Sequence, residues 1–161
     1  MKGGVSYENY NLNNSFFIFG YKLSDDSILK IYMMDSVGRH RMNNEKYYEF
    51  MDLIMLLYDI TDRHSFQDCI DYFSLQIKER CNDNVKVILL GNKADLEDKR
   101  EVPLEEAEEF AFLNNYLFME ISCQTNKNIK EAFETIFEIN KSGQNASNKK
   151  NVNKLLKYIN Y

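Results

Sequence analysis

Short aliphatic runs alternate with amphipathic segments along most of this chain. The runs at residues 53–58, 85–90 and 116–121 are rich in Leu, Ile, Val or aromatic residues, which is typical of strands buried in a sheet. Between the first two runs, apolar residues recur at helical spacing, at Phe66, Ile70, Phe73 and Ile77. This alternation predicts a three-layer α/β fold with a mostly parallel sheet.

Three further segments complete the predicted architecture. Residues 16–23 and 28–35 are β-prone runs around a polar turn at 24–27, which predicts an antiparallel hairpin. A helix is expected just after Pro103, with an apolar stripe at Leu104, Ala107, Phe110 and Ala111. A last helix is expected from Ile129, where Asn128 and Glu131 have the spacing of a capping box.

The length of 161 residues fits one domain with a substantial core. We expect a polar arm at residues 1–15, the α/β domain at 16–139, and an Asn/Lys-rich tail at 140–161. A net charge of -5 argues against nucleic acid as a partner. The three cysteines lack metal-ligand or disulfide spacing, so reduced thiols are expected. No apolar run approaches the ~20 residues of a membrane span, so no transmembrane segment is predicted.

Polar side chains follow the 85–90 run directly. After Gly91 come Asn92, Lys93 and Asp95, where an α/β sheet places its ligands, just beyond the carboxyl ends of the strands. A carboxylate can accept from both N1–H and the exocyclic amine of guanine, a pair that adenine does not present. The amide suits N7 or a neighbouring loop, and the lysine stem can lie along a ring. These residues favour a guanine site, and a plain polar turn between strand and helix is the alternative.

With these motifs in order along the chain, the sequence resembles a Ras-superfamily small GTPase, most closely a Rab. The resemblance extends from about residue 15 to residue 139. It is carried by residues 47–66, by residues 91–102 (beginning Gly-Asn-Lys-Ala-Asp), and by residues 120–125 (Glu-Ile-Ser-Cys-Gln-Thr). The resemblance implies a small G domain with the P-loop NTPase architecture, binding GTP or GDP with Mg²⁺.

The resemblance also implies site residues. Asn92, Lys93 and Asp95 would hold the guanine base. A second base-contacting loop would comprise Ser122, Cys123 and Gln124, with Gln124 at the position of the family's lysine.

The phosphate side is implied in the same way. Asp35 would reach the magnesium through water, and the Gly38 amide would meet the γ-phosphate. In such proteins the γ-phosphate orders two loops, and effector or regulatory proteins bind according to their state.

The chain departs from the family pattern at several points. The printed sequence contains no Gly-x-x-x-x-Gly-Lys-[Ser/Thr] phosphate loop, so we expect a domain lacking the family's first strand, phosphate loop and first helix. Arg39 replaces the glutamine that orients the attacking water, so no catalytic residue is assigned. Leu12 stands near the position of the switch I threonine. No cysteine follows Cys123, so we expect no C-terminal prenylation.

Two functions follow as expectations. The first is a Rab-like GTP-binding switch in intracellular vesicle trafficking or signalling, with impaired or absent hydrolysis, located in the cytoplasm or peripherally on endomembranes. The alternative is a pseudo-GTPase that binds no nucleotide and serves as a protein–protein interaction module.

Overall fold

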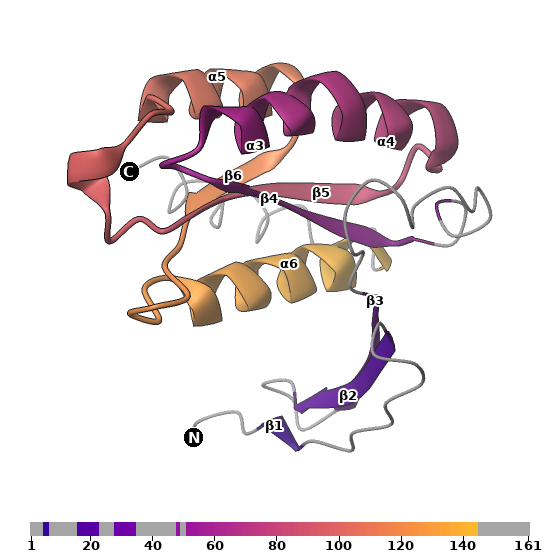
Figure 1. Ribbon diagram of the computed structural model, residues 1–161. Helices are drawn as coiled ribbons and strands as arrows, with labels where there is room; N and C mark the ends of the chain where they lie inside the picture. Colours follow the sequence, from indigo (N-terminus) through magenta and orange to yellow (C-terminus); the bar gives the residue numbers. More distant parts are fainter. Residues whose placement is uncertain (1–4, 7–15, 23–27, 35–47, 49–50, 145–161) are drawn as a thin grey trace. The chain divides into compact units, whose positions relative to one another are not determined.

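The computed structural model describes residues 5–6, 16–22, 28–34, 48 and 51–144 (Figure 1). The chain divides into two compact units, residues Met1–Glu45 and Lys46–Tyr161, and each is described by itself. The predicted division at residues 15 and 139 stays a prediction.

The first unit contains an antiparallel sheet of order β1-β2-β3. Strand β2 (Phe16–Lys22) pairs with β3 (Ile28–Met34) in the register Phe19↔Ile31, which confirms the predicted hairpin. The two-residue strand β1 (Val5–Ser6) adds to the other edge of β2, with Val5 opposite Tyr21. β1 lies within residues 1–15, for which the sequence predicted a polar arm.

The second unit is built on a parallel sheet of order β4-β5-β6. It comprises β4 (Leu53–Asp59), β5 (Lys86–Asn92) and β6 (Leu117–Glu120). Five consecutive residues of β5, 87–91, are buried, because helices cover both faces of this central strand. The predicted parallel strands are therefore confirmed.

Helices complete three layers in this unit. One face of the sheet carries α3 (Arg63–Asp68), α4 (Ser74–Arg80) and α5 (Leu104–Leu113), and the other carries α6 (Ile129–Gln144) (Figure 1). A π-helical turn, η1 (Cys69–Phe73), joins α3 to α4, and a short 3-10 turn, η2 (Glu97–Lys99), follows β5. The three-layer α/β fold expected from the hydrophobic pattern is thus confirmed for this part of the chain.

The core lies between the sheet and the α3–α5 layer. Phe66 of α3 is fully buried, and its ring centroid lies 4.9 Å from that of Tyr58 on β4 and 5.8 Å from that of Phe110 on α5. Ala107 and Ala111 are buried as predicted, but Leu104 is 36% exposed. Leu104, the first residue of α5, is on the same helix face as Ala107 and Ala111 but at the end of that face, where it is exposed and not part of the buried stripe.

The end of β5 requires a glycine. A Cβ atom at Gly91 would lie 2.7 Å from the hydroxyl oxygen of Tyr58, on the neighbouring strand. The Tyr58 hydroxyl is buried and has no hydrogen-bond partner among the described residues, and burial raises its pKa. The absence of a side chain at Gly91 therefore leaves the space that the buried Tyr58 side chain occupies.

The capping box expected at the start of α6 does not form. Asn128 has a left-handed backbone (φ 58°), and its side-chain amide donates to the Glu120 carbonyl at 2.8 Å. The asparagine amide thus connects the loop to the end of β6 and is not turned back to cap α6.

Candidate functional site

The polar residues of the site lie at the carboxyl ends of three parallel strands. The register pairs Asp59 on β4 with Asn92 on β5, and Gly91 on β5 with Glu120 on β6. Because the strands are parallel, the loops that follow them emerge at one edge of the sheet. The parallel register therefore brings side chains together that are about 30 residues apart in the chain.

The loop after β5 is fixed by backbone hydrogen bonds on both sides. The Ile60 amide donates to the Asn92 carbonyl at 3.1 Å, and the Ala94 amide donates to the Ile121 carbonyl at 3.0 Å. Between them, Lys93 has a left-handed backbone with φ 66°, and its carbonyl accepts from Leu96 at 2.8 Å. The loop is thus held between the ends of β4 and β6 and turns sharply at Lys93.

Asp95 is an exposed carboxylate held from behind by a buried hydroxyl. The Ser122 hydroxyl is completely buried and donates to Oδ1 of Asp95 at 2.5 Å. The same hydroxyl oxygen accepts from the Thr125 amide at 3.1 Å, which fixes its orientation. Among the described residues, Oδ2 of Asp95 accepts no hydrogen bond. The carboxylate is therefore positioned by one oxygen and open to a ligand through the other.

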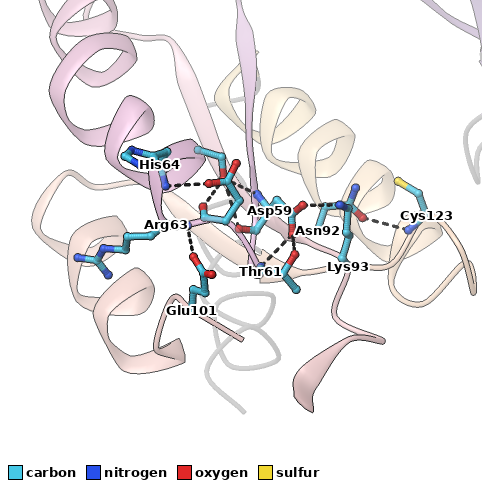
Figure 2. Close-up of polar contacts among 10 residues, drawn as sticks. Asp59, Thr61, Arg63, His64, Asn92, Lys93, Glu101 and Cys123 are labelled. Carbon is cyan, nitrogen blue, oxygen red and sulfur yellow. Dashed lines mark hydrogen bonds and ion pairs between the residues drawn. The ribbon is translucent and has the colours of Figure 1, made fainter. Parts of the chain in front are cut away.

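Asn92 links the loop after β5 to the loop after β6 through one atom of its side-chain amide. Its Oδ1 accepts from the Cys123 amide at 3.1 Å (Figure 2). Within the described part of the chain, its Nδ2 has no partner. Cys123 and the neighbouring Gln124 are exposed, and no hydrogen bond to the Gln124 side chain is found in that part. The structure thus brings Asn92, Asp95, Ser122 and Cys123 together, and Gln124 is the next residue of the same loop.

Lys93 has a partner that the sequence analysis did not predict. Its ammonium lies 2.5 Å from Oδ2 of Asp59, while Oδ1 of Asp59 accepts from the amide and hydroxyl of Thr61 at 2.9 and 2.7 Å (Figure 2). Burial opposes ionisation of Asp59, but Lys93 and Thr61 outweigh it and hold the pKa of Asp59 below its ordinary value. The signal that could have revealed this pair is the position of Asp59, at the end of the strand beside β5.

A second ion-pair network, centred on Arg100, holds the segment that follows the loop after β5. The Arg100 guanidinium bonds both carboxylate oxygens of Glu120, at 2.7 and 2.9 Å, and both of Glu97. It also donates to the Val102 carbonyl at 3.0 Å. Arg100 and Glu120 are each only 15% exposed, and these carboxylates raise the pKa of Arg100. The network ties the segment after Asp95 to the end of β6.

The residues predicted for the phosphate side of the site belong to a different part of the chain. Asp35, Gly38 and Arg39 lie outside the described residues. In the described part of the chain, no group of three or more His, Cys, Asp or Glu could hold a metal ion. No helix there has the length and apolar character needed to cross a bilayer.

Comparison with known proteins identifies the family. A model of the Ras family matches residues 16–141. The chain is 37% identical over 127 residues to the GTP-binding protein ypt2 of Schizosaccharomyces pombe, covering 77% of this chain and 63% of that protein. It is 38% identical over 116 residues to the Ras-related protein Rab-3D of Mus musculus, covering 71% of this chain but 52% of that protein. The chain therefore belongs to the Ras family, and within that family it is Rab-like.

Proposed function

We propose that this chain binds guanine nucleotides through the carboxyl edge of its parallel sheet and acts as a Rab-like switch in intracellular vesicle trafficking or signalling. The observation that carries the proposal is the Asp95 carboxylate, held by Ser122 through Oδ1 and open through Oδ2, beside the unpartnered Nδ2 of Asn92. The relatives' names, a GTP-binding protein and a Ras-related protein, support the same reading.

The chemistry of this cluster suits guanine and not adenine. Guanine presents two adjacent donors, N1–H and the exocyclic amine, and an exposed carboxylate accepts from both. Oδ1 of Asp95 keeps a second lone pair after its bond to Ser122, so both oxygens can take part. Adenine presents an acceptor at N1, which a carboxylate would repel. Asn92 Nδ2 can donate to N7, while Asn92 Oδ1 accepts from the Cys123 amide and holds the two loops together.

The described residues fit the base but do not extend to the phosphates. GTP or GDP would bring a magnesium ion whose charge offsets that of the phosphates. By family resemblance, Asp35 and Gly38 would serve that side. We further propose that hydrolysis is impaired, because Arg39 cannot accept a proton or orient water as a glutamine does. Effector or regulatory proteins would be the partners, in the cytoplasm or at the surface of endomembranes.

The test is nucleotide binding by the Asp95→Asn variant. GDP with magnesium at ~100-fold over its Kd should add about 2.7 kcal/mol to the stability of the unmodified chain. This is a rise of several degrees in Tm. Asparagine replaces one of the two acceptors by a donor, so the shift with GDP should disappear. A shift with xanthosine diphosphate should appear, because its base has a carbonyl where guanine has the amine.

Asp98→Asn is the matched control, since Asp98 is an exposed carboxylate three residues away on η2. It should bind GDP like the unmodified chain. Equal GDP shifts for Asp95→Asn and the unmodified chain would overturn the proposal.

The second candidate is the nucleotide-free interaction module. Arg39 and Leu12, both internal positions that differ from the family pattern, favour it. It predicts a cooperative thermal transition that no guanine nucleotide moves.

A further inference from the structure

The loop after β6, residues 121–127, supplies two of the groups that hold the proposed base site. The Ser122 hydroxyl donates to Oδ1 of Asp95 at 2.5 Å, and the Cys123 amide donates to Oδ1 of Asn92 at 3.1 Å. The loop lies between β6 and α6, outside both elements, so its shape depends on the hydrogen bonds that close it. The placement of the Asp95 carboxylate therefore depends on how this loop is closed.

Two hydrogen bonds close the loop, one inside the other. The inner bond runs from the Ser122 amide to the Lys127 carbonyl at 3.0 Å. The outer bond runs from the side-chain amide of Asn128 to the Glu120 carbonyl at 2.8 Å. The Lys127 carbonyl belongs to the planar peptide that joins Lys127 to Asn128, so the placement of Asn128 directs the inner bond as well.

Asn128 is fixed on both sides of the loop. Its backbone is left-handed, with φ 58°, a conformation that asparagine adopts more readily than most residues. Its carbonyl accepts from the Ala132 amide at 3.0 Å, in the first turn of α6. The acceptor of its side-chain amide is also fixed, because Glu120 pairs with Gly91 in the sheet and is held by Arg100. Asn128 thus joins the start of α6 to the end of β6.

A second left-handed asparagine in the loop makes no such bond. Asn126 has φ 61° and an exposed side chain. Within the described residues, that side chain has no hydrogen-bond partner. Asn128 is partly buried, and its side chain reaches back to β6. The bond to the Glu120 carbonyl, and not the left-handed backbone, therefore distinguishes Asn128.

We propose that Asn128 is a positioning residue of the base site, whose side-chain amide keeps the loop after β6 closed and so places the Ser122 hydroxyl behind the Asp95 carboxylate. This inference rests on the proposed guanine function. It assigns to Asn128 a role exerted through Ser122, which requires no contact between Asn128 and the nucleotide.

The test removes the Asn128 side chain without straining the backbone. Asn128→Gly deletes the amide and keeps the left-handed turn, which glycine adopts freely. In titrations of the 161-residue chain with GDP and magnesium, binding should weaken about fivefold. Asn126→Gly is the matched control, because it makes the same backbone change in the same loop, and it should bind GDP like the unmodified chain. Equal affinities of the two variants would overturn the role of Asn128.

A ratio of affinities separates positioning from a loss of stability. Inosine diphosphate lacks the exocyclic amine of guanine, so the preference for GDP over it reports how well the Asp95 carboxylate is placed. In Asn128→Gly this preference should shrink about threefold. A variant that is only less stable would lose affinity for both nucleotides equally, and an unchanged ratio would therefore contradict the proposal.

A double-mutant cycle identifies the route. Ser122→Ala removes the hydroxyl through which Asn128 is proposed to act. The double variant with Asn128→Gly should bind GDP no more weakly than Ser122→Ala alone. Additive losses of affinity would show that Asn128 acts independently of Ser122 and would overturn the route.

A further readout needs no nucleotide. The Thr125 amide donates to the Ser122 hydroxyl, so its exchange with solvent reports opening of the loop. In the free chain, Asn128→Gly should accelerate this exchange about fivefold, and more than that of the Leu89 amide in the middle of β5. Asn128→Asp keeps the shape of the side chain but has no donor for the Glu120 carbonyl. It should give the same result, and it replaces the glycine variant if thermal unfolding shows that variant to be unfolded.

The outcomes separate the two proposals. Failure of the unmodified chain to bind GDP would overturn the guanine function, while the exchange of the Thr125 amide would still decide whether Asn128 holds the loop closed. GDP binding that is unchanged by Asn128→Gly would overturn the role of Asn128 alone.

Discussion

Two groups of residues form the site at the carboxyl edge of the parallel sheet, here called the base side and the turn side, and their hydrogen bonds span different distances along the chain. The base side is tied across the fold, and its members are Asn92, Asp95, Arg100, Glu120, Ser122 and Cys123. Its bonds join residues 20 to 31 positions apart. The turn side is tied locally, and its members are Asp59, Thr61, Asp62, His64 and Ser65. Its bonds join residues 2 to 6 positions apart. The Lys93–Asp59 ion pair bridges the two.

This difference has a consequence for stability and binding. Local bonds can form within a short segment, whereas the long-range bonds exist only after β4, β5 and β6 have assembled. The base side is therefore a product of the whole sheet. Changes there should lower both global stability and guanine affinity, whereas changes to local or remote contacts should affect one without the other.

The largest effect is expected from Arg100→Met. Arg100 and Glu120 are nearly buried, so removing the arginine leaves a carboxylate without its counter-charge. The free energy of unfolding should fall by about 2–4 kcal/mol. Urea denaturation monitored by circular dichroism measures it. Arg63→Met, at a pair whose side chains are 42% and 37% exposed, should lower the free energy of unfolding much less, because water screens an exposed ion pair. Equal losses for the two variants would show that burial does not separate these ion pairs.

A smaller loss is expected from Ser122→Ala. The buried hydroxyl bonds both Asp95 and the Thr125 amide, so its removal should cost about 1–3 kcal/mol. GDP affinity should fall as well, because Asp95 loses its anchor. Ser74→Ala is the matched control, since Ser74 is also buried and bonds Tyr116 at 3.1 Å, away from the site. Chemical denaturation and GDP titration of both variants should show two stability losses but only one loss of affinity.

The smallest effect concerns the pH dependence of the Asp59 pair. The pKa of Asp59 is lowered in the folded chain from its ordinary value of 3.8. Its stabilising contribution is therefore complete above that value and is lost as the pH falls through the lowered pKa. The stability difference between the unmodified chain and Asp59→Asn should be under about 1 kcal/mol at neutral pH. It should stay constant down to about pH 4 and shrink as the pH is lowered further, measured by urea denaturation across that range. A difference that grows on acidification would contradict the assignment of the ion pair.

The hydrophobic pattern was sufficient to predict the sheet. The aliphatic run ending at Gly91 indicated a buried strand, and the polar residues after it were expected at the ligand edge. The Lys93–Asp59 pair was not predictable in this way, because it depends on the register that sets Asp59 beside Asn92. Likewise, the spacing of Asn128 and Glu131 suggested a cap, but the left-handed backbone at Asn128 turns its amide to β6. Pattern reasoning thus predicted the elements and missed the contacts that depend on register and backbone handedness.

The left-handed backbone of Lys93 also limits which sequences can occupy this loop. For residues with a Cβ atom, that conformation costs roughly 1–2 kcal/mol, and β-branched side chains fit it worst. In a saturation library at position 93, valine and isoleucine should therefore be depleted by the backbone alone, in selections for folding without any nucleotide. Glycine would be enriched under that selection and depleted under selection for binding, since it relieves the backbone but has neither stem nor ammonium. The gap between the two enrichment profiles would separate what the chain requires of this position from what its ligand requires.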